Sequence, residues 1–161
     1  DGPIAIRYPR GSAHQGLREY QAPVEYGRSE IIRKGKKIAV LGVGSMIPSC
    51  MEICKGLKDD GYDPTFVNAR FVKPLDVDLL DELAKDHSLF VTVEENVKSG
   101  GYGEHVSAYM EACHPEIRVL SAAVWDRFVP QGNVESLRSR IGLGVEDIRQ
   151  AIEDSEELRE Q

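Results

Sequence analysis

The segment Ile38-Ala39-Val40-Leu41-Gly42-Val43-Gly44-Ser45 carries the clearest structural signal in the sequence. Its first four residues form a short apolar run, typical of a parallel strand whose sheet is covered by helices on both faces. The glycines that follow predict a turn, and Ser45 is a suitable N-cap for a helix that continues to about residue 60. Pro48 is compatible with the first turn of such a helix. The segment therefore predicts a strand that leads directly into a covering helix.

The same alternation of strand and helix continues toward the C-terminus. Further strands are predicted at 65–69, 89–93 and 117–120, and further helices at 77–85, 102–113, 134–141 and 145–158. Asp76 is a suitable N-cap for the helix at 77–85. Strands that alternate with helices imply crossover connections and a mostly parallel sheet. The sequence thus predicts a three-layer α/β/α sandwich, an α/β fold, over residues 36–161.

The first quarter of the chain differs in charge and in pattern from the rest. A short strand is predicted at 4–8, between Gly2-Pro3 and Pro9-Arg10-Gly11, and short edge strands are predicted within 24–33. Residues 1–37 hold eight Lys and Arg against four Asp and Glu, a net of +4, whereas residues 38–161 hold twelve against twenty-three, a net of −11. We therefore divide the chain into a strand segment at 1–11, a linker with short edge strands at 12–35, and a main domain at 36–161.

Composition excludes several classes of protein. With 41% hydrophobic and 29% charged residues, the chain is expected to form a soluble globular domain. Its formal net charge of −7 argues against a nucleic-acid partner, and the absence of an apolar run of about 18 residues argues against a membrane partner. The three cysteines suggest neither a disulfide framework nor a zinc site, because Cys50 and Cys54 do not form a CxxC pair. These features predict a cytoplasmic protein.

The glycines at 42 and 44 invite comparison with a dinucleotide-binding turn. The third glycine of that motif is missing, because Ile47 stands in its place, and Asn68-Ala69-Arg70 supplies no acidic residue at the end of the second strand. A plain tight turn is the better interpretation.

The segment Glu94-Glu95-Asn96, with Gly100-Gly101-Tyr102-Gly103 after it, is more distinctive. Carboxylates at the carboxyl edge of a parallel sheet lie where α/β folds bind ligands, so an acid–base role is conceivable. The alternative, which we favour, is structural: Glu95 accepts hydrogen bonds from the glycine turn or pairs with a base such as Arg70. The sequence leaves both roles open.

Histidines and cysteines offer little further chemistry. The four histidines, at positions 14, 87, 105 and 114, show no metal-ligand spacing. Cys113 and His114 are neighbours on a predicted helix, where adjacent side chains point apart, so they do not predict a nucleophile and its base. We predict no catalytic residue and no metal site in this chain.

Arg7 is the candidate substrate-binding residue. In a strand, Ile4, Ile6 and Tyr8 share one face and Arg7 lies on the other, so its guanidinium is free to bind a phosphate or a carboxylate. A surface salt bridge is the alternative role, and Arg10, exposed by the Pro9 turn, is the rival residue.

Taken in order, five motifs resemble one enzyme family. They are Gly2-Pro3, Arg7-Tyr8-Pro9-Arg10-Gly11, Arg70-Phe71-Val72-Lys73-Pro74-Leu75-Asp76, Val93-Glu94-Glu95-Asn96 with its glycine turn, and Phe128-Val129-Pro130-Gln131-Gly132. Together they resemble the C-terminal part of the 1-deoxy-D-xylulose-5-phosphate synthase family. The stretches at 7–11 and 70–76 distinguish this family from transketolase and from the beta subunits of pyruvate dehydrogenase.

The resemblance implies a larger enzyme that depends on thiamine diphosphate and Mg²⁺. Such a synthase condenses pyruvate with glyceraldehyde 3-phosphate and releases carbon dioxide, on the route to isoprene units and thiamine. Its cofactor lies between the first two domains, and the third serves architecture and the homodimer. By this resemblance residues 1–11 are the last strand of the pyrimidine-binding domain, and Arg7 contacts the substrate phosphate.

One departure from the family concerns activity. The Gly-Asp-Gly…Asn segment that holds Mg²⁺ in thiamine-diphosphate enzymes is absent from this sequence, as is the domain that carries the activating glutamate. We therefore expect this chain to bind no cofactor and to be inactive alone, with the N-terminal catalytic domains as its partners. The alternatives are a stand-alone docking module whose acidic surface faces a basic partner, and a nucleotide-binding module built on residues 42–45.

Overall fold

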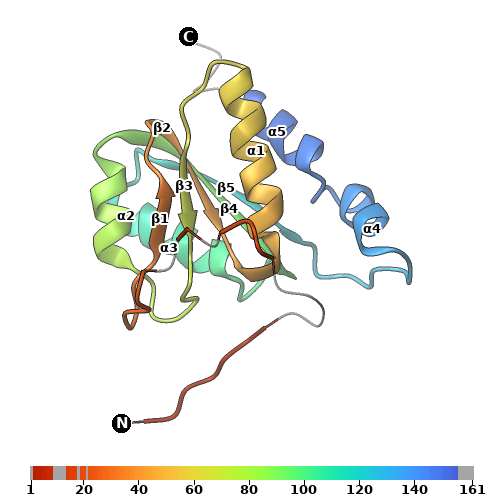
Figure 1. Ribbon diagram of the computed structural model, residues 1–161, viewed down its shortest axis with the longest axis horizontal. Coiled ribbons are helices and arrows are strands. Elements are labelled where there is room, and N and C mark those ends of the chain that lie inside the picture. The colour runs from red at the N-terminus through yellow and green to blue at the C-terminus, as the bar shows by residue number, and fades with distance from the viewer. Residues whose placement is uncertain (1, 9–13, 18, 21, 156–161) are drawn as a thin grey trace.

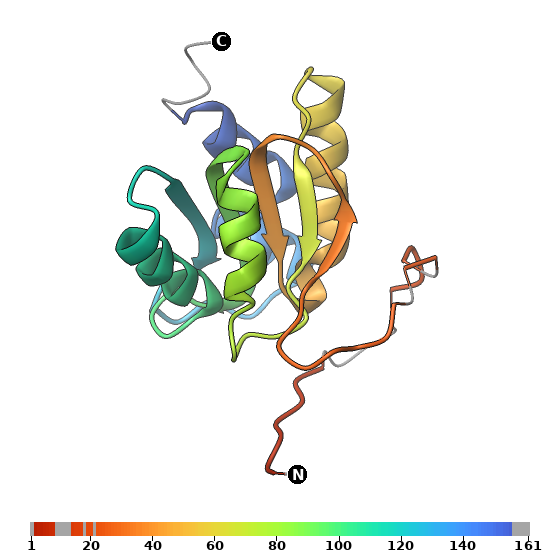
Figure 2. The same cartoon turned by 90° about the vertical axis from the view of Figure 1, so that its left-hand side faces the viewer.

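A computed structural model describes residues 2–8, 14–17, 19–20 and 22–155 of the chain. Its centre is a five-stranded sheet with the strand order β1-β3-β2-β4-β5. Four strands are parallel: β2 (Lys37–Gly42), β3 (Thr65–Asn68), β4 (His87–Val97) and β5 (Arg118–Val124). The edge strand β1 (Glu30–Arg33) runs antiparallel to β3. The predicted α/β sandwich with a mostly parallel sheet is confirmed (Figures 1 and 2).

Helices cover both faces of the sheet because the central strand is apolar on both sides. Ile38 and Val40 of β2 belong to the core beneath α1 (Ile47–Asp59) and α5 (Val145–Glu153). The intervening Ala39 and Leu41 belong to the core beneath α2 (Val77–Ala84) and α3 (Tyr102–Cys113). This is the alternation expected of a strand buried between two helical layers.

The helix starts agree with the sequence in two places and differ in one. Asp76 caps α2 by accepting a hydrogen bond from the Leu79 amide at 3.3 Å, and Pro48 lies in the first turn of α1, as predicted. Ser45 is not the N-cap of α1. A 3₁₀ turn, η1 (Gly44–Met46), intervenes, so α1 begins at Ile47 without a side-chain cap. Ser45 thereby becomes free to contact β4.

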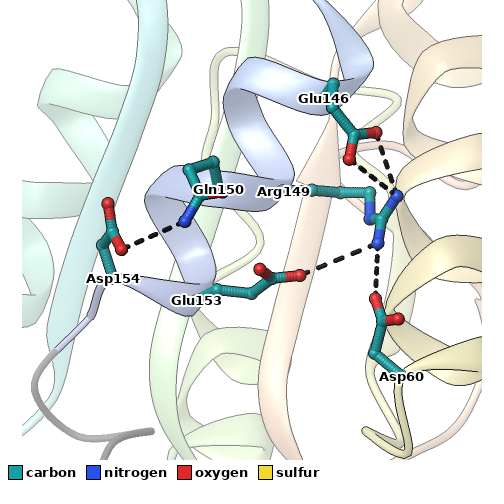
Figure 3. A network of polar contacts seen from close by, with 6 residues as sticks. All are labelled: Asp60, Glu146, Arg149, Gln150, Glu153 and Asp154. Atoms are coloured by element: carbon teal, nitrogen blue, oxygen red, sulfur yellow. Dashed lines mark hydrogen bonds and ion pairs between the residues drawn. The ribbon is translucent and has the colours of Figure 1, made fainter.

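An ion-pair network joins the two helices on one face of the sheet (Figure 3). Arg149 of α5 reaches Asp60, just after α1, at 2.5 Å, and Glu146 and Glu153 of its own helix at 2.9 and 3.7 Å. Gln150 and Asp154 bond nearby at 3.1 Å. The Arg149 guanidinium therefore ties the end of α1 to α5, above the apolar contact between the two helices.

Several predicted boundaries were wrong. Residues 2–8 are extended (Figure 1), but no strand of the described residues pairs with them, so they form no strand here, and only 30–33 form a strand within 24–33. Strand β4 continues to Val97, and β5 continues to Val124, because each pairs with the other beyond the apolar runs. Helix α5 ends at Glu153, and residues 156–158 of the predicted helix lie outside the described residues.

The remaining helix, α4 (Val134–Arg140), lies beside the main layers (Figure 1). None of its residues is buried, so packing contributes little to its position. In the described part of the chain, no helix is long and apolar enough to cross a membrane.

Candidate functional site at the carboxyl edge of the sheet

Strand β4 is irregular at the point where the sheet ends. Val93 pairs with Ala122 and Val97 with Val124, so three residues, Glu94 to Asn96, occupy the length that Ala123 fills in β5. Strand β2 stops opposite Val93, so these residues extend beyond the centre of the sheet. Such bulges redirect side chains at functional edges. Here the irregularity presents three consecutive polar side chains at the carboxyl edge.

Glu94, on β4, caps the N-terminus of α3, the helix that follows this strand. Its side chain is fully buried and accepts hydrogen bonds from the amides of Tyr102, at 3.0 Å, and Gly103, at 2.8 Å. These amides belong to the first turn of α3, where Gly101 provides no side-chain cap and the helix dipole favours a negative group. Of the two structural roles that the sequence left open for Glu95, binding of the glycine turn belongs to Glu94 instead.

The glycines of the turn are required by close contacts. A Cβ on Gly101 would lie 2.6 Å from Glu94 Oε1, and a Cβ on Gly103 would lie 1.9 Å from Ser121 Oγ. Helix α3 can approach the carboxylate and β5 only because both positions lack a side chain. Packing therefore accounts for Gly101 and Gly103, and the left-handed backbone of Gly100, with a φ of 73°, accounts for the first glycine of the motif.

Glu95 faces the other side of the sheet, as alternation along a strand requires. Its Oε1 accepts from Arg138 Nε at 3.0 Å, and its Oε2 accepts from Ser45 Oγ at 2.7 Å. The predicted pairing of Glu95 with a basic residue is confirmed, but the residue is Arg138 rather than Arg70, which pairs with Glu30 at 2.5 Å. Both Glu94 and Glu95 are thus engaged by structural partners, and the edge is suited to positioning and binding rather than to acid–base chemistry.

Arg7 lies at the same edge. The guanidinium of this exposed residue donates a hydrogen bond to Asn96 Oδ1, and Asn96 Nδ2 donates to Glu94 Oε2 at 3.2 Å. The two motifs that contain Arg7 and Asn96 are separated by 89 positions and meet here. The sequence pointed to Arg7 and to the motif that contains Asn96, but it predicted no role for Asn96 or Arg138, because spacing along the chain does not reveal a contact between distant segments. Arg10 lies outside the described residues.

Exposed apolar side chains gather around this site. The large exposed hydrophobic residues of the described chain lie in the N-terminal segment, before β1, at the end of β4, or in the segments that follow β3 and β5: Ile4, Ile6, Tyr8, Val24, Tyr26, Val72, Val77, Val97, Trp125, Phe128 and Val134. In a parallel sheet, the segments after the strands meet at the carboxyl edge, and an antiparallel edge strand begins there. Figure 1 shows the N-terminal segment on this same side. We call this surface the apolar edge; exposed patches of this kind mark interaction sites.

The glycine turn after β2 is a packing feature. A Cβ on Gly42 would lie 2.8 Å from Cys50 Sγ and 2.9 Å from Ile47 Cδ1, and Gly44 has a φ of 53°. Close contact with α1 and a left-handed turn account for both glycines. This favours the tight turn that the sequence suggested over a dinucleotide site.

The Cys113-His114 pair lies at the opposite edge, in a hollow of about 520 Å³ between the ends of α2 and α3. His114 Nε2 contacts Asp81 Oδ1 at 2.7 Å, and the Tyr109 hydroxyl donates to the same oxygen at 2.8 Å. The bond to Asp81 raises the pKa of Tyr109 to about 12, and His114 in turn lowers the pKa of Asp81. His114 therefore links the end of α3 to α2. Its Nε2 contacts Asp81 rather than Cys113, so the pair does not form a nucleophile with its base.

The described residues contain no cluster of three or more His, Cys, Asp or Glu side chains that could hold a metal ion. The carboxylates at the carboxyl edge are also unavailable, because α3, Arg138 and Ser45 already engage them. Mg²⁺ needs several oxygen ligands. The described residues therefore do not fit a magnesium diphosphate.

Comparison with known proteins identifies the family. The model of the transketolase C-terminal domain matches residues 27–148. The chain belongs to the transketolase C-terminal domain family. A curated 1-deoxy-D-xylulose-5-phosphate synthase of Lachnoclostridium phytofermentans is 42% identical over 149 residues, which are 92% of this chain and 24% of that protein. The same enzyme of Dictyoglomus thermophilum is 40% identical, over 94% of this chain and 25% of that protein.

A solved structure agrees with this assignment. The present chain superposes on a split-gene transketolase, described as an inactive beta4 tetramer, with a TM-score of 0.78 and 28% identity. The match covers 85% of this chain and 45% of that one. The chain spans about a quarter of the length of the curated synthases that it matches.

Proposed function

We propose that this chain is the C-terminal part of a 1-deoxy-D-xylulose-5-phosphate synthase and is inactive by itself. The whole enzyme would condense pyruvate with glyceraldehyde 3-phosphate, with loss of carbon dioxide, using thiamine diphosphate and Mg²⁺ held by domains that precede this one. The chain is 35–42% identical to curated 1-deoxy-D-xylulose-5-phosphate synthases over nearly its whole length, and this similarity supports the proposed reaction. The proposal includes a transferase of isoprene-unit synthesis, a homodimer and a cytoplasmic location.

The observation that carries the proposal is the apolar edge. Phe128 is 104% exposed and Trp125 is 57% exposed, and a chain that acted alone would gain nothing from such exposure. Both side chains follow β5, on the side of the sheet where Arg7 meets Asn96. We therefore assign the apolar edge to contact with the catalytic domains.

The proposal also assigns each segment of the chain to a domain of the whole enzyme. Residues 1–11 are proposed as the last strand of the pyrimidine-binding domain, 12–35 as the linker, and 36–161 as the C-terminal domain. Ile4, Ile6 and Tyr8 are all more than 70% exposed, which suits a strand whose partners lie in another domain. Arg7 is proposed to bind the phosphate of glyceraldehyde 3-phosphate, for which a guanidinium is well suited.

The transketolase-like neighbour gives independent support for inactivity. That split-gene chain carries a domain of this fold and forms an inactive beta4 tetramer. In the present chain, the carboxylates at the carboxyl edge hold structural partners rather than a metal. The chain's contribution is thus a scaffold and one substrate-binding side chain.

Association with catalytic domains can be tested directly. The L. phytofermentans synthase, shortened by the region that matches this chain, is mixed with the 161-residue protein, and complex formation is measured by calorimetry. We expect binding by the unaltered chain and none by a W125S/F128S variant, with K85S as the matched surface control at the opposite edge. Equal binding by all three proteins, or by none, would refute the docking role.

A further inference from the structure

Arg7 is an exposed, long side chain, yet one neutral group holds its guanidinium at the carboxyl edge. We propose that Asn96 is a positioning residue that orients Arg7 toward the substrate phosphate, and that Glu94 sets the orientation of the Asn96 amide. This inference rests on the proposed function, because it takes Arg7 as the phosphate contact. It adds a route by which the C-terminal domain acts on substrate binding.

The orientation of Asn96 follows from hydrogen-bond chemistry. The Glu94 carboxylate can only accept, and its two oxygens already receive the Tyr102 and Gly103 amides. Asn96 can therefore approach it only with its amide nitrogen, which lies 3.2 Å from Glu94 Oε2. The carbonyl oxygen of Asn96 is then forced to the opposite side, where it meets Arg7.

The support beneath Asn96 is rigid. Glu94 is fully buried, and the first turn of α3 and the backbone of Gly101 enclose its carboxylate. A side chain anchored on a buried group loses little further entropy when it binds another group. The hydrogen bonds from α3 to Glu94, and from Asn96 to Glu94, therefore hold the Asn96 oxygen in one position, where it accepts from the Arg7 guanidinium.

A neutral partner suits this task better than a charged one. Arginine has five N–H donors and no acceptor, so the bond to Asn96 leaves the other donors available for phosphate. An amide oxygen also leaves the positive charge of Arg7 intact. A carboxylate at position 96 would pair with Arg7 as a salt bridge, compete with the phosphate, and face Glu94 as a like charge.

The kinetic test uses a fusion in which this chain replaces the matching region of the L. phytofermentans synthase. Activity is measured with glyceraldehyde 3-phosphate and with unphosphorylated D-glyceraldehyde. We expect N96L to raise KM for the phosphorylated substrate by about two- to tenfold, the cost of freeing one ordered side chain, with kcat and the unphosphorylated substrate little changed. We expect N96D to raise that KM further.

The matched control is N68L, which removes an amide from the end of β3, a strand of the same sheet that β2 separates from β4. It should leave the ratio of the two KM values unchanged. Equal effects of N96L on both substrates, or no effect on either, would overturn the inference, because a merely structural role does not distinguish the phosphate.

A second measurement separates this inference from the proposed function. In the 161-residue chain alone, ¹⁵N NMR of the arginine side chains is expected to show Arg7 shifted and slowed in exchange, and N96L is expected to return it to the values of a free arginine. An Arg7 signal that does not respond to N96L overturns the inference even if the fusion is active. An inactive fusion with a responsive Arg7 overturns the proposed function instead.

Discussion

Glu94 shows how one side chain can organise a functional edge. A residue on a strand caps a helix that begins eight positions later, and the same carboxylate orients Asn96. The glycines at 101 and 103 make room for it. At the residue scale, the carboxyl edge is thus ordered by a buried acceptor rather than by a catalytic acid.

Replacing Glu94 by Gln tests this role. The change introduces an N–H donor that faces the Tyr102 and Gly103 amides, so at least one hydrogen bond to a charged group is lost. We expect E94Q to lower the free energy of unfolding by about 1.5–3 kcal/mol, measured by urea denaturation. The control E82Q changes an exposed carboxylate on α2 and should have little effect. A loss no greater than that of the control would contradict the capping role.

His87 makes stability depend on pH. Its Nδ1 lies 2.8 Å from the Leu83 carbonyl and its Nε2 lies 2.7 Å from Thr65 Oγ, and the same hydroxyl accepts from the Gly35 amide at 2.9 Å. Because the Leu83 carbonyl can only accept, the neutral ring carries its hydrogen on Nδ1, and Nε2 accepts from the Thr65 hydroxyl. Burial accordingly lowers the pKa of His87 below its usual value near 6.5, despite the opposing bond to Leu83.

Because the unfolded state takes up the proton first, stability is fully present above pH 6.5 and is lost as pH falls below it. Urea denaturation between pH 7.5 and 5 should show this decline in the unaltered chain and a flatter profile in H87Q. The exposed His105 provides the control, and H105Q should keep the original slope. If H87Q retains the full pH dependence, the buried neutral ring is not its source.

At the element scale, α4 differs from the other helices. It has no buried residue, and its Asn133 N-cap accepts from the Glu135 amide at 3.0 Å. Within α4, Arg138 makes an ion pair with Glu95 of β4. The chain after the helix returns to the core at Ile141 and Leu143, so this ion pair fixes the helix beyond its C-terminal end.

Breaking that pair should release α4 without unfolding the domain. We expect R138A to reduce hydrogen-exchange protection in residues 134–140, while the free energy of unfolding changes by less than about 1 kcal/mol. R140A alters the same helix at an exposed position and should leave protection unchanged. Unchanged exchange in R138A would mean that α4 is held by other contacts.

The elements that the sequence predicted well are those whose signal is local. The apolar run at 38–41 and the Asp76 cap gave β2 and α2 nearly to the residue. The ends of β4 and β5 were missed because pairing between the strands, not hydrophobicity, extends them past residues 93 and 120. Ser45 was predicted as the N-cap of α1, but its hydroxyl donates a hydrogen bond to Glu95, 50 positions away, which the local sequence does not indicate.

At the scale of the whole molecule, helices cover both faces of the sheet, but one edge of the sheet leaves large apolar side chains exposed. Both faces of the sheet are covered, while the carboxyl edge displays Trp125, Phe128 and the extended residues 2–8. The family could be inferred from motifs because each motif is contiguous. The contact of Arg7 with Asn96 could not, because it depends on how distant loops meet.

The apolar edge should matter for association and not for folding. Because Trp125 and Phe128 are exposed, we expect W125S/F128S to change the free energy of unfolding by no more than about 0.5 kcal/mol, as is usual for surface positions. Urea denaturation checks this value. A large loss of stability would show that these side chains support the domain itself.

The central claim is that this domain serves a synthase whose reaction centre lies in other domains. The most direct test is the formation of 1-deoxy-D-xylulose 5-phosphate from pyruvate and glyceraldehyde 3-phosphate, with thiamine diphosphate and Mg²⁺ supplied, by the 161-residue chain and by its fusion to the catalytic region of the L. phytofermentans synthase. The account predicts product from the fusion and none from the chain alone. Product from the chain alone, or a folded fusion that makes none, would contradict it.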